Sequence, residues 1–222
     1  MEQRTFLSTG TTRDDRLTRD SIARALTALP KRSDRSDAAT SRMLSQAATE
    51  APWTPSSPLV PAAVLVPLVQ REDGLTVLLT KRTAHLTNHG GQISFPGGRM
   101  EPADTDPTAA ALRESQEEIG LSPDEVDVLG NLDDYVTVTG FHVVPVVGLI
   151  QPPLRLTPDS FEVEDIFEVP LDFILDPAHH QRHSRVSPSG ETRYFHAIPF
   201  KDRYIWGATA AMLVNLYEAL TQ

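Results

Sequence analysis

Three glutamates, Glu114, Glu117 and Glu118, are the residues whose type and spacing best suit chemistry. They fall three and four positions apart, so on a helix they share one face. On an exposed helix each like-charged pair costs only about 0.2–0.5 kcal/mol, which allows an ordinary solvated acidic face. In a partly buried cleft each pair at ~6 Å would repel by roughly 3 kcal/mol, and a counter-ion would be needed. All-oxygen ligands favour Mg²⁺ or Mn²⁺ over zinc.

The residues before the glutamates favour the cleft. Gly97 and Gly98 allow a close approach of the backbone, and the Gly97 carbonyl would then be a further metal ligand. Arg113 stands directly before Glu114, and Asp104 lies upstream as a partner for Arg113. Such an ion pair would tie the loop to the helix without touching a substrate.

Capping residues predict the helix that carries these carboxylates. Asp106 suits the N-cap, Pro107 suits the first helical position, and Gly120 suits the position after the last turn. Leu112 and Ile119 lie on roughly the opposite side from the glutamates. They are therefore expected to hold the helix to a hydrophobic core.

The rest of the chain predicts an α+β fold of one domain, residues 56–222, preceded by an N-terminal extension, residues 1–55, with a short helix. A turn signal at 72–74 separates two apolar, β-branched runs and indicates a hairpin. We predict strands at 62–69, 75–82, 92–95, 126–129, 135–138, 142–150, 193–198 and 204–206, and helices at 13–29, around 43–47 and at 208–220.

Composition narrows the classes of function. The chain has 222 residues and a net charge of −10 without a Lys/Arg run, which argues against nucleic-acid binding. The absence of cysteine excludes disulfides, thiolate zinc sites and a Cys nucleophile. The longest apolar run, 59–69, is too short to span a membrane, and the N-terminus lacks the apolar core of a signal peptide. A cytoplasmic protein without membrane contact is expected. The oligomeric state is left open, with a homodimer as one option.

The stretch from Gly97 to Leu121 resembles a Nudix box. The pattern of that box is Gly, five residues, Glu, seven residues, then Arg-Glu-aliphatic-x-Glu-Glu-x-Gly-aliphatic. Residues 113–121 match its second half except at Ser115. In the first half, five residues separate Gly98 from Asp104, which replaces the glutamate. Eight residues rather than seven then precede Arg113. The resemblance implies structural roles for Gly98, Asp104, Arg113 and Gly120.

The flanks are similar to one branch of this superfamily, the coenzyme A pyrophosphatases. The similar segments are 78–98, 129–150, 161–171 and 204–213, so the likeness spans about residues 60–220. It implies an α/β/α sandwich with a mixed central sheet and a catalytic loop-helix-loop. It also implies that Mg²⁺ or Mn²⁺, held by Glu114, Glu117 and Glu118 with the Gly97 carbonyl, assists hydrolysis of a diphosphate bond. Coenzyme A would yield 4′-phosphopantetheine and adenosine 3′,5′-bisphosphate.

Three residues outside the box are further candidates. Glu162 would complete the site as a metal ligand or general base, and its alternative is an ordinary surface glutamate. Arg82 and Lys81 end a predicted strand that points toward the box, and they would bind phosphate, including the 3′-phosphate. For both, the alternative is a solubilising charge at a strand end. 

Other polar and aromatic residues are given structural roles. The histidines at 179, 180 and 183 have no carboxylate at ligand spacing, which favours a solvated loop over a metal site. Trp206 with Gly207 is expected to seat the closing helix in the core.

Other functions remain open on the sequence alone. A Nudix hydrolase acting on another nucleoside diphosphate, such as NADH or ADP-ribose, is the nearest alternative. A nucleotide-binding module without catalysis is a second alternative, although such a module would be expected to lose box carboxylates. A plain acidic interaction protein is a third, and it predicts that no divalent cation binds.

Overall fold

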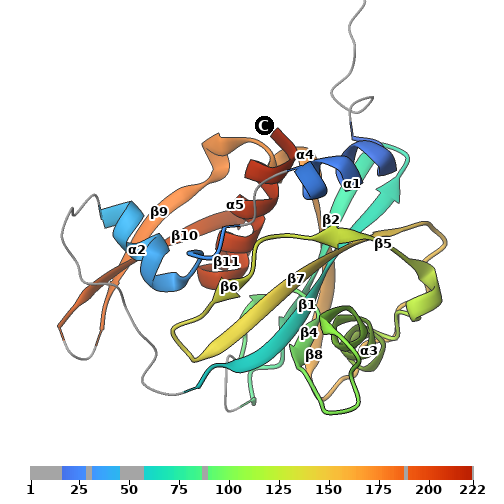
Figure 1. Ribbon diagram of the computed structural model, residues 1–222, viewed down its shortest axis with the longest axis horizontal. Helices are drawn as coiled ribbons and strands as arrows, with labels where there is room; N and C mark the ends of the chain where they lie inside the picture. The colour runs from blue at the N-terminus through green and yellow to red at the C-terminus, as the bar shows by residue number, and fades with distance from the viewer. Residues whose placement is uncertain (1–16, 29–31, 46–57, 87–89, 188–189, 222) are drawn as a thin grey trace, which may run out of the picture.

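The computed structural model describes residues 17–28, 32–45, 58–86, 90–187 and 190–221 (Figure 1). Its elements, in chain order, are α1 (Arg19–Ala28), α2 (Asp37–Ser45), β1 (Val60–Arg71), β2 (Gly74–Arg82), β3 (Ile93–Ser94), β4 (Gly97–Arg99), α3 (Pro107–Ile119), η2 (Pro123–Glu125), β5 (Val126–Asn131), β6 (Tyr135–Val136), β7 (Phe141–Ile150), β8 (Val163–Pro170), α4 (Leu171–Ile174), η3 (Pro177–His179), β9 (Gln181–Val186), β10 (Thr192–Phe200), β11 (Arg203–Trp206) and α5 (Gly207–Thr221).

The central sheet is mixed, as expected. Its main order is β3-β2-β1-β7-β5, and β4, β6 and β8 pair with β1, β7 and β2 respectively. β1 and β7 run parallel from Val60↔Phe141 to Val69↔Ile150, whereas the other pairs of this sheet are antiparallel. The predicted β1–β2 hairpin is confirmed, and its last pair is Arg71↔Gly74. β1 therefore lies at the centre and is buried along most of its length.

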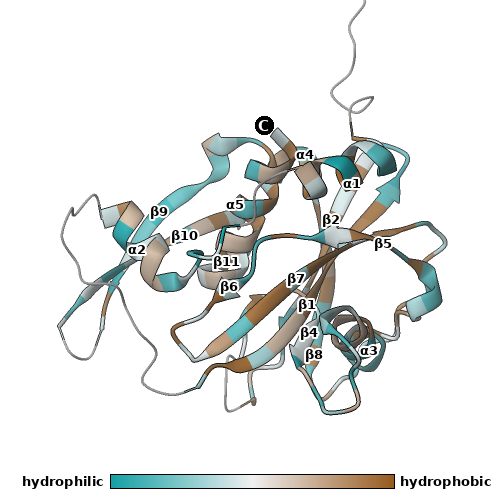
Figure 2. Cartoon of the chain, in the orientation of Figure 1, coloured by the Kyte–Doolittle hydropathy of each residue, from teal (hydrophilic) through white to brown (hydrophobic). Residues whose placement is uncertain are grey.

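Helices cover both faces of this sheet, which confirms the α/β/α sandwich. On one face α3 packs through Ala111 and Ile119 into a cluster that includes Leu65 of β1. On the other face α1 and α5 pack through Ile22 and Leu213. Figure 2 shows the hydrophobic central strands between these helices. The two apolar clusters fix the sheet, and with it the position of α3.

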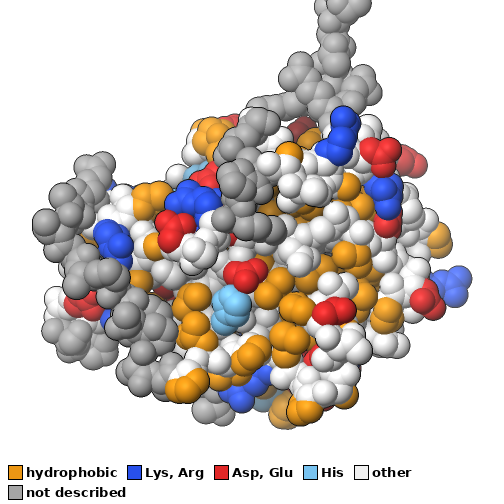
Figure 3. All heavy atoms as spheres, in the orientation of Figure 1, with side chains coloured by type: hydrophobic (Ala, Val, Ile, Leu, Met, Phe, Trp, Pro, Cys, Tyr) orange, Lys and Arg blue, Asp and Glu red, His pale blue; other side chains and the backbone are white. Residues whose placement is uncertain are grey.

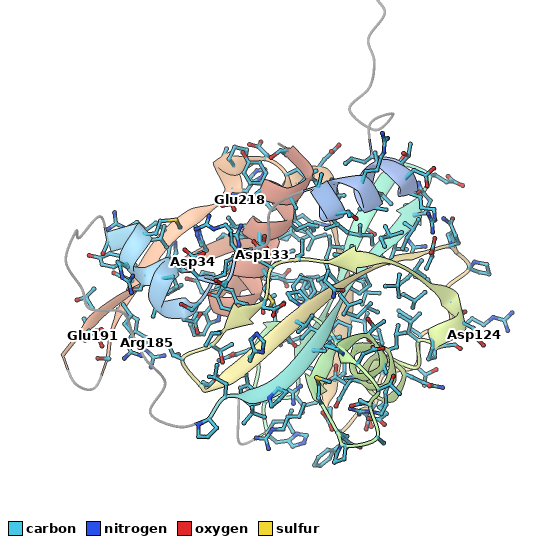
Figure 4. The ribbon with its side chains drawn as sticks, in the orientation of Figure 1. Asp34, Asp124, Asp133, Arg185, Glu191 and Glu218 are labelled. Atoms are coloured by element: carbon cyan, nitrogen blue, oxygen red, sulfur yellow. The ribbon has the colours of Figure 1, made fainter. Side chains whose placement is uncertain are left out.

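The described part of the N-terminal extension packs against the domain. Ile22 and Leu26 of α1 are buried, as their helical spacing predicts. Arg35, just before α2, lies 2.6 Å from carboxylate oxygens of both Asp133 and Glu218. Figure 4 labels these two acidic residues, which come from the β5–β6 connection and from α5. The ends of the predicted helices, at 13–16, 29 and 46–47, lie outside the described residues.

A second sheet, β11-β10-β9, is antiparallel and lies beside α2 and α5 (Figure 1). β10 and β11 were predicted, but β9 was not, and the prediction of a solvated histidine loop was wrong. His183 lies within β9, and the His179 ring stacks on Phe173 with Nδ1 2.9 Å from the Phe173 carbonyl oxygen. Most β9 side chains are exposed and polar, so the sequence of this strand lacks the apolar pattern from which a strand is predicted.

On the face in Figure 3, acidic and basic side chains lie scattered around hydrophobic ones and form no large basic patch. In the part of the chain that the structure describes, no helix is long and apolar enough to cross a membrane.

Candidate active site

Helix α3 begins and ends where its capping residues predict. The Asp106 carboxylate accepts a hydrogen bond of 2.9 Å from the Ala109 amide, and Pro107 occupies the first helical position. Gly120 adopts a left-handed conformation, with φ of 70°, and donates to the Gln116 carbonyl. A residue with a side chain would be strained there, which explains why glycine ends this helix.

Ser115, the departure from the aliphatic position of the box, is fully buried. Its hydroxyl donates a hydrogen bond of 2.7 Å to the Ala111 carbonyl, one helical turn earlier. The polar group is therefore satisfied within the helix and does not disturb the packing of α3 on the sheet.

The two glycines of β4 let the loop approach the helix closely. A Cβ atom on Gly98 would lie 2.5 Å from the carboxyl carbon of Glu114, so a side chain at this position would displace the Glu114 carboxylate. The Gly97 amide donates a hydrogen bond of 3.2 Å to Glu118. β4 is held in place by its pairing with β1, Val64↔Gly97. The strand therefore brings the loop backbone against two of the three box glutamates.

Arg113 joins the loop to the helix. Its guanidinium donates two hydrogen bonds of 3.0 Å to Asp104, and it contacts Glu114 at 3.0 Å and Glu117 at 3.1 Å. It also donates to the Arg99 carbonyl. The hydrogen bonds from Arg113 lower the pKa of Asp104. The ion pair expected from the sequence thus forms, and the shorter Asp104 side chain reaches Arg113 despite the longer spacing.

Arg82, at the end of β2, lies between two carboxylates from different elements. It donates to Glu118 of α3 at 3.1 Å, and it lies 3.6 Å from Glu162, which directly precedes β8. The structure does not bring Lys81 to this group. Lys81 Nζ pairs instead with Glu164 at 2.6 Å. Adjacent strand residues point to opposite faces, so only one of the two can reach the carboxylates.

Burial sets the electrostatics of these carboxylates. The Glu118 side chain is 4% exposed, and burial raises its pKa to about 7, against the opposing effects of the Gly97 amide and Arg82. Burial also raises the pKa of Glu114. The charges of Glu114 and Glu162 both add to the upward shift at Glu118. Three carboxylates therefore repel one another in a partly dry site, which a bound cation would relieve.

A single cavity of about 1180 Å³ connects this group to the second sheet. One end is lined by the box glycines and by Glu114, Glu118 and Glu162. Glu117 does not line the cavity, and its side chain is 60% exposed. The lining also includes apolar residues from several elements, among them Phe95, Phe141, Val143, Phe195, Trp206 and Met212. Charged residues of α2, β9 and β10 line the remainder.

The donor set fits a hard divalent cation. Across the described ranges, no three Asp, Glu or His side chains are grouped as they stand closely enough to enclose a metal ion. Arg113 draws Glu114 and Glu117 toward itself, and Arg82 does the same with Glu118. The buried, mutually repelling oxygens of Glu114 and Glu118 nevertheless supply the chemistry that Mg²⁺ or Mn²⁺ requires.

Several cavity residues could not be found from the sequence. Trp206 was assigned to packing alone, and Arg42, Arg185 and Arg193 carry no recognisable motif. They come from elements far apart in the chain, so only the fold brings them to one cavity. Arg99 had a weak signal, because it follows the two glycines directly. Its guanidinium lies 5.4 Å from the centre of the Phe141 ring.

Comparison with known proteins identifies the family of this chain. Residues 59–189 match the model of the NUDIX domain family. The Nudix hydrolase NudL of Cronobacter sakazakii is 44% identical over 164 residues, covering 70% of this chain and 80% of that protein. The peroxisomal coenzyme A diphosphatase NUDT7 of Mus musculus is 40% identical over 141 residues, covering 63% of this chain and 59% of NUDT7. A Caenorhabditis elegans Ap4A hydrolase structure has a TM-score of 0.44 at 20% identity, over 50% of this chain and 80% of that chain. The chain belongs to the Nudix hydrolase family, whose members cleave pyrophosphate bonds.

Proposed function

We propose that this enzyme hydrolyses the diphosphate bond of coenzyme A, or of a coenzyme A derivative, to 4′-phosphopantetheine and adenosine 3′,5′-bisphosphate. The observation that carries the proposal is the 40% identity with the mouse coenzyme A diphosphatase. The cavity supports it, because its lining combines the box carboxylates with apolar residues from several elements. A substrate with a diphosphate joined to a long, largely uncharged arm suits both parts.

Nudix hydrolases act with divalent metal ions, and we assign the ligands of Mg²⁺ or Mn²⁺ here to Glu114, Glu117 and Glu118, with the Gly97 carbonyl. When bound, such ions neutralise the diphosphate oxygens and lower the pKa of water. Glu117 would have to turn from its exposed position beside Arg113 toward the cavity. Glu114 and Glu118 already line it.

The other residues of the site orient groups and transfer protons. Arg113 fixes the loop and the first glutamate, and Asp104 keeps the Arg113 guanidinium in place. Glu162 accepts the proton of the attacking water, since it lines the cavity and shares its arginine partner, Arg82, with Glu118. Arg82 lies beside Glu162 and Glu118, where its charge favours an incoming diphosphate. No covalent intermediate is needed, because water adds to one phosphorus as the bridging oxygen leaves.

A substrate panel tests this proposal. The purified protein is incubated with Mg²⁺ and, in separate reactions, coenzyme A, NADH and ADP-ribose, and the products are identified by mass spectrometry. We expect the highest kcat/KM for a coenzyme A compound. A higher kcat/KM for NADH or ADP-ribose would instead support the nearest alternative. Tight nucleotide binding without any product would support the non-catalytic module.

A further inference from the structure

Three arginines line the part of the cavity that lies away from the box carboxylates. Arg42 comes from α2, Arg185 from β9 and Arg193 from β10. Figure 4 labels Arg185 and Glu191 on the β9–β10 hairpin, on the opposite side of the view from α3. A local group of cations is unexpected in a chain with a net charge of −10.

The pairing of the hairpin places two of these charges against each other. Arg193 is the direct cross-strand partner of Arg185. Like charges in this position destabilise a strand pair. Glu191 partly balances them through contacts of 3.0 and 3.1 Å to Arg193. The hairpin therefore keeps an arrangement that costs stability at the rim of the cavity, and a bound anion would offset that cost.

Arg42 gives independent evidence from a different element. Its Nε atom is buried and, among the residues that the structure describes, makes no hydrogen bond. An unsatisfied buried donor is costly. Because this atom is closed off from solvent, an anion in the cavity would contact Arg42 through its terminal nitrogens. The nearby carboxylate of Asp37 is already engaged, since it accepts hydrogen bonds from the Tyr135 hydroxyl at 2.9 Å and the Val138 amide at 2.8 Å.

The wall that carries these arginines is held by specific contacts. The Tyr194 amide of β10 donates a hydrogen bond of 2.9 Å to the Ser41 hydroxyl of α2. Asp37 fixes the start of α2 to the β6 region, and Arg35 anchors the preceding segment. The backbone that carries the three arginines is therefore fixed before any ligand arrives, which reduces the entropy lost on binding.

We propose that Arg42, Arg185 and Arg193 form a second anion subsite, which binds a phosphate or carboxylate group of the substrate other than the diphosphate that is cleaved. This inference rests on the proposed function, because a coenzyme A compound supplies such a group in two ways. One is the 3′-phosphate of the ribose, and the other is a terminal carboxylate on an acyl group. The apolar residues of the lining, among them Phe141 and Trp206, would accommodate the adenosine if the 3′-phosphate binds here, and the pantetheine arm if the acyl carboxylate does.

Binding ratios test the subsite separately from catalysis. Kd is measured for coenzyme A, dephospho-coenzyme A, succinyl-coenzyme A and butyryl-coenzyme A on the full chain with a chelator present. The ligands form two pairs, coenzyme A with dephospho-coenzyme A and succinyl-coenzyme A with butyryl-coenzyme A. Both members of a pair contain the diphosphate, so its repulsion by the glutamates cancels in the ratio of their Kd values. The variant is Arg185→Gln with Arg193→Gln. The matched control, Arg24→Gln with Arg155→Gln, removes two exposed charges outside the cavity.

In the wild type, we expect the Kd ratio of at least one pair to favour the ligand with the extra anion by roughly threefold or more. This ratio should fall toward one in the variant but not in the control. A change in the first pair identifies the 3′-phosphate, and a change in the second identifies the acyl carboxylate. Ratios equal in wild type and variant, or no binding of any of the four ligands, would overturn the subsite. Binding without product when Mg²⁺ is added would instead overturn the proposed function and leave the subsite standing.

Discussion

Arg82 of β2 donates a hydrogen bond to Glu118 of α3 across 3.1 Å, and the same guanidinium lies 3.6 Å from Glu162. This arginine joins the end of a sheet strand to the box helix and to the segment before β8. It is thus a positive charge shared by two cavity carboxylates. It also lies where an incoming diphosphate would need a cation.

The two basic residues that end β2 should differ in function. Arg82→Ala should raise KM at least about tenfold, because a charged hydrogen-bond donor to the diphosphate is lost. Lys81→Ala should change KM less than about twofold, because Lys81 pairs with Glu164 outside the cavity. Steady-state kinetics on both variants with coenzyme A measures the difference. Equal effects of the two substitutions would contradict the placement of Arg82.

Stability without metal should depend on the charge of Glu118. Its pKa rises from an ordinary 4.5 to about 7 on folding, so the folded state holds this proton more tightly. Stability from this group therefore falls as the pH rises from about 4.5 to about 7, and stays low above that. Glu118→Gln should stabilise the metal-free protein at pH ~8 by up to about 3 kcal/mol. Urea denaturation with a chelator measures this gain.

The gain from Glu118→Gln should nearly disappear near pH ~4.5, where the wild-type carboxyl is protonated in the folded state and about half protonated in the unfolded state. Glu125→Gln is a suitable control, because Glu125 is an exposed carboxylate that only caps a short turn. A gain that is constant across this pH range would show that burial of the charge is not its cause.

Divalent cations should stabilise the folded protein through the same carboxylates. A ligand that binds only the folded form raises Tm with its concentration. The rise with Mg²⁺ should be larger at pH ~8 than at pH ~5.5, because a proton on Glu118 competes with the metal. The variant Glu114→Gln with Glu118→Gln should show little rise. Differential scanning calorimetry gives the shift, and an unchanged shift in the variant would place the metal elsewhere.

The N-terminal extension should contribute to the stability of the whole domain. Arg35 is about 16% exposed in its side chain and pairs with Asp133 and Glu218. Arg35→Ala leaves two partly buried carboxylates without their cation and should cost roughly 2–4 kcal/mol. Urea denaturation measures the loss. Arg24→Ala, on an exposed position of α1, should cost less than about 0.5 kcal/mol.

Local signals were sufficient to predict α3 and the β1–β2 hairpin. Asp106, Pro107 and Gly120 act on the backbone within a few residues, so their effect is visible in the sequence. The pair between Asp104 and Arg113 was also predictable, because both lie in one short loop-helix segment. Alternation of apolar residues located most strands of the sheet, although β9 is mainly exposed and lacks that pattern.

The positions of residues that depend on contacts between distant parts of the chain were not predictable from the sequence. Neighbouring residues at the end of β2 have similar chemistry, and only strand pairing decides that Arg82 rather than Lys81 reaches Glu118. The role of α2 as a cavity wall depends on contacts such as that between Ser41 and Tyr194, which are 153 residues apart. No local pattern encodes such a contact.

The most direct test of the account is the cleavage of coenzyme A by wild-type protein and by Glu118→Gln, with Mg²⁺ in ¹⁸O-labelled water. Mass spectrometry should find 4′-phosphopantetheine and adenosine 3′,5′-bisphosphate, with one ¹⁸O atom in one of the two products. The variant should keep its fold by circular dichroism and lose at least about a hundredfold in rate. Undiminished cleavage by the variant, or no cleavage of coenzyme A by the wild type, would contradict the central claim.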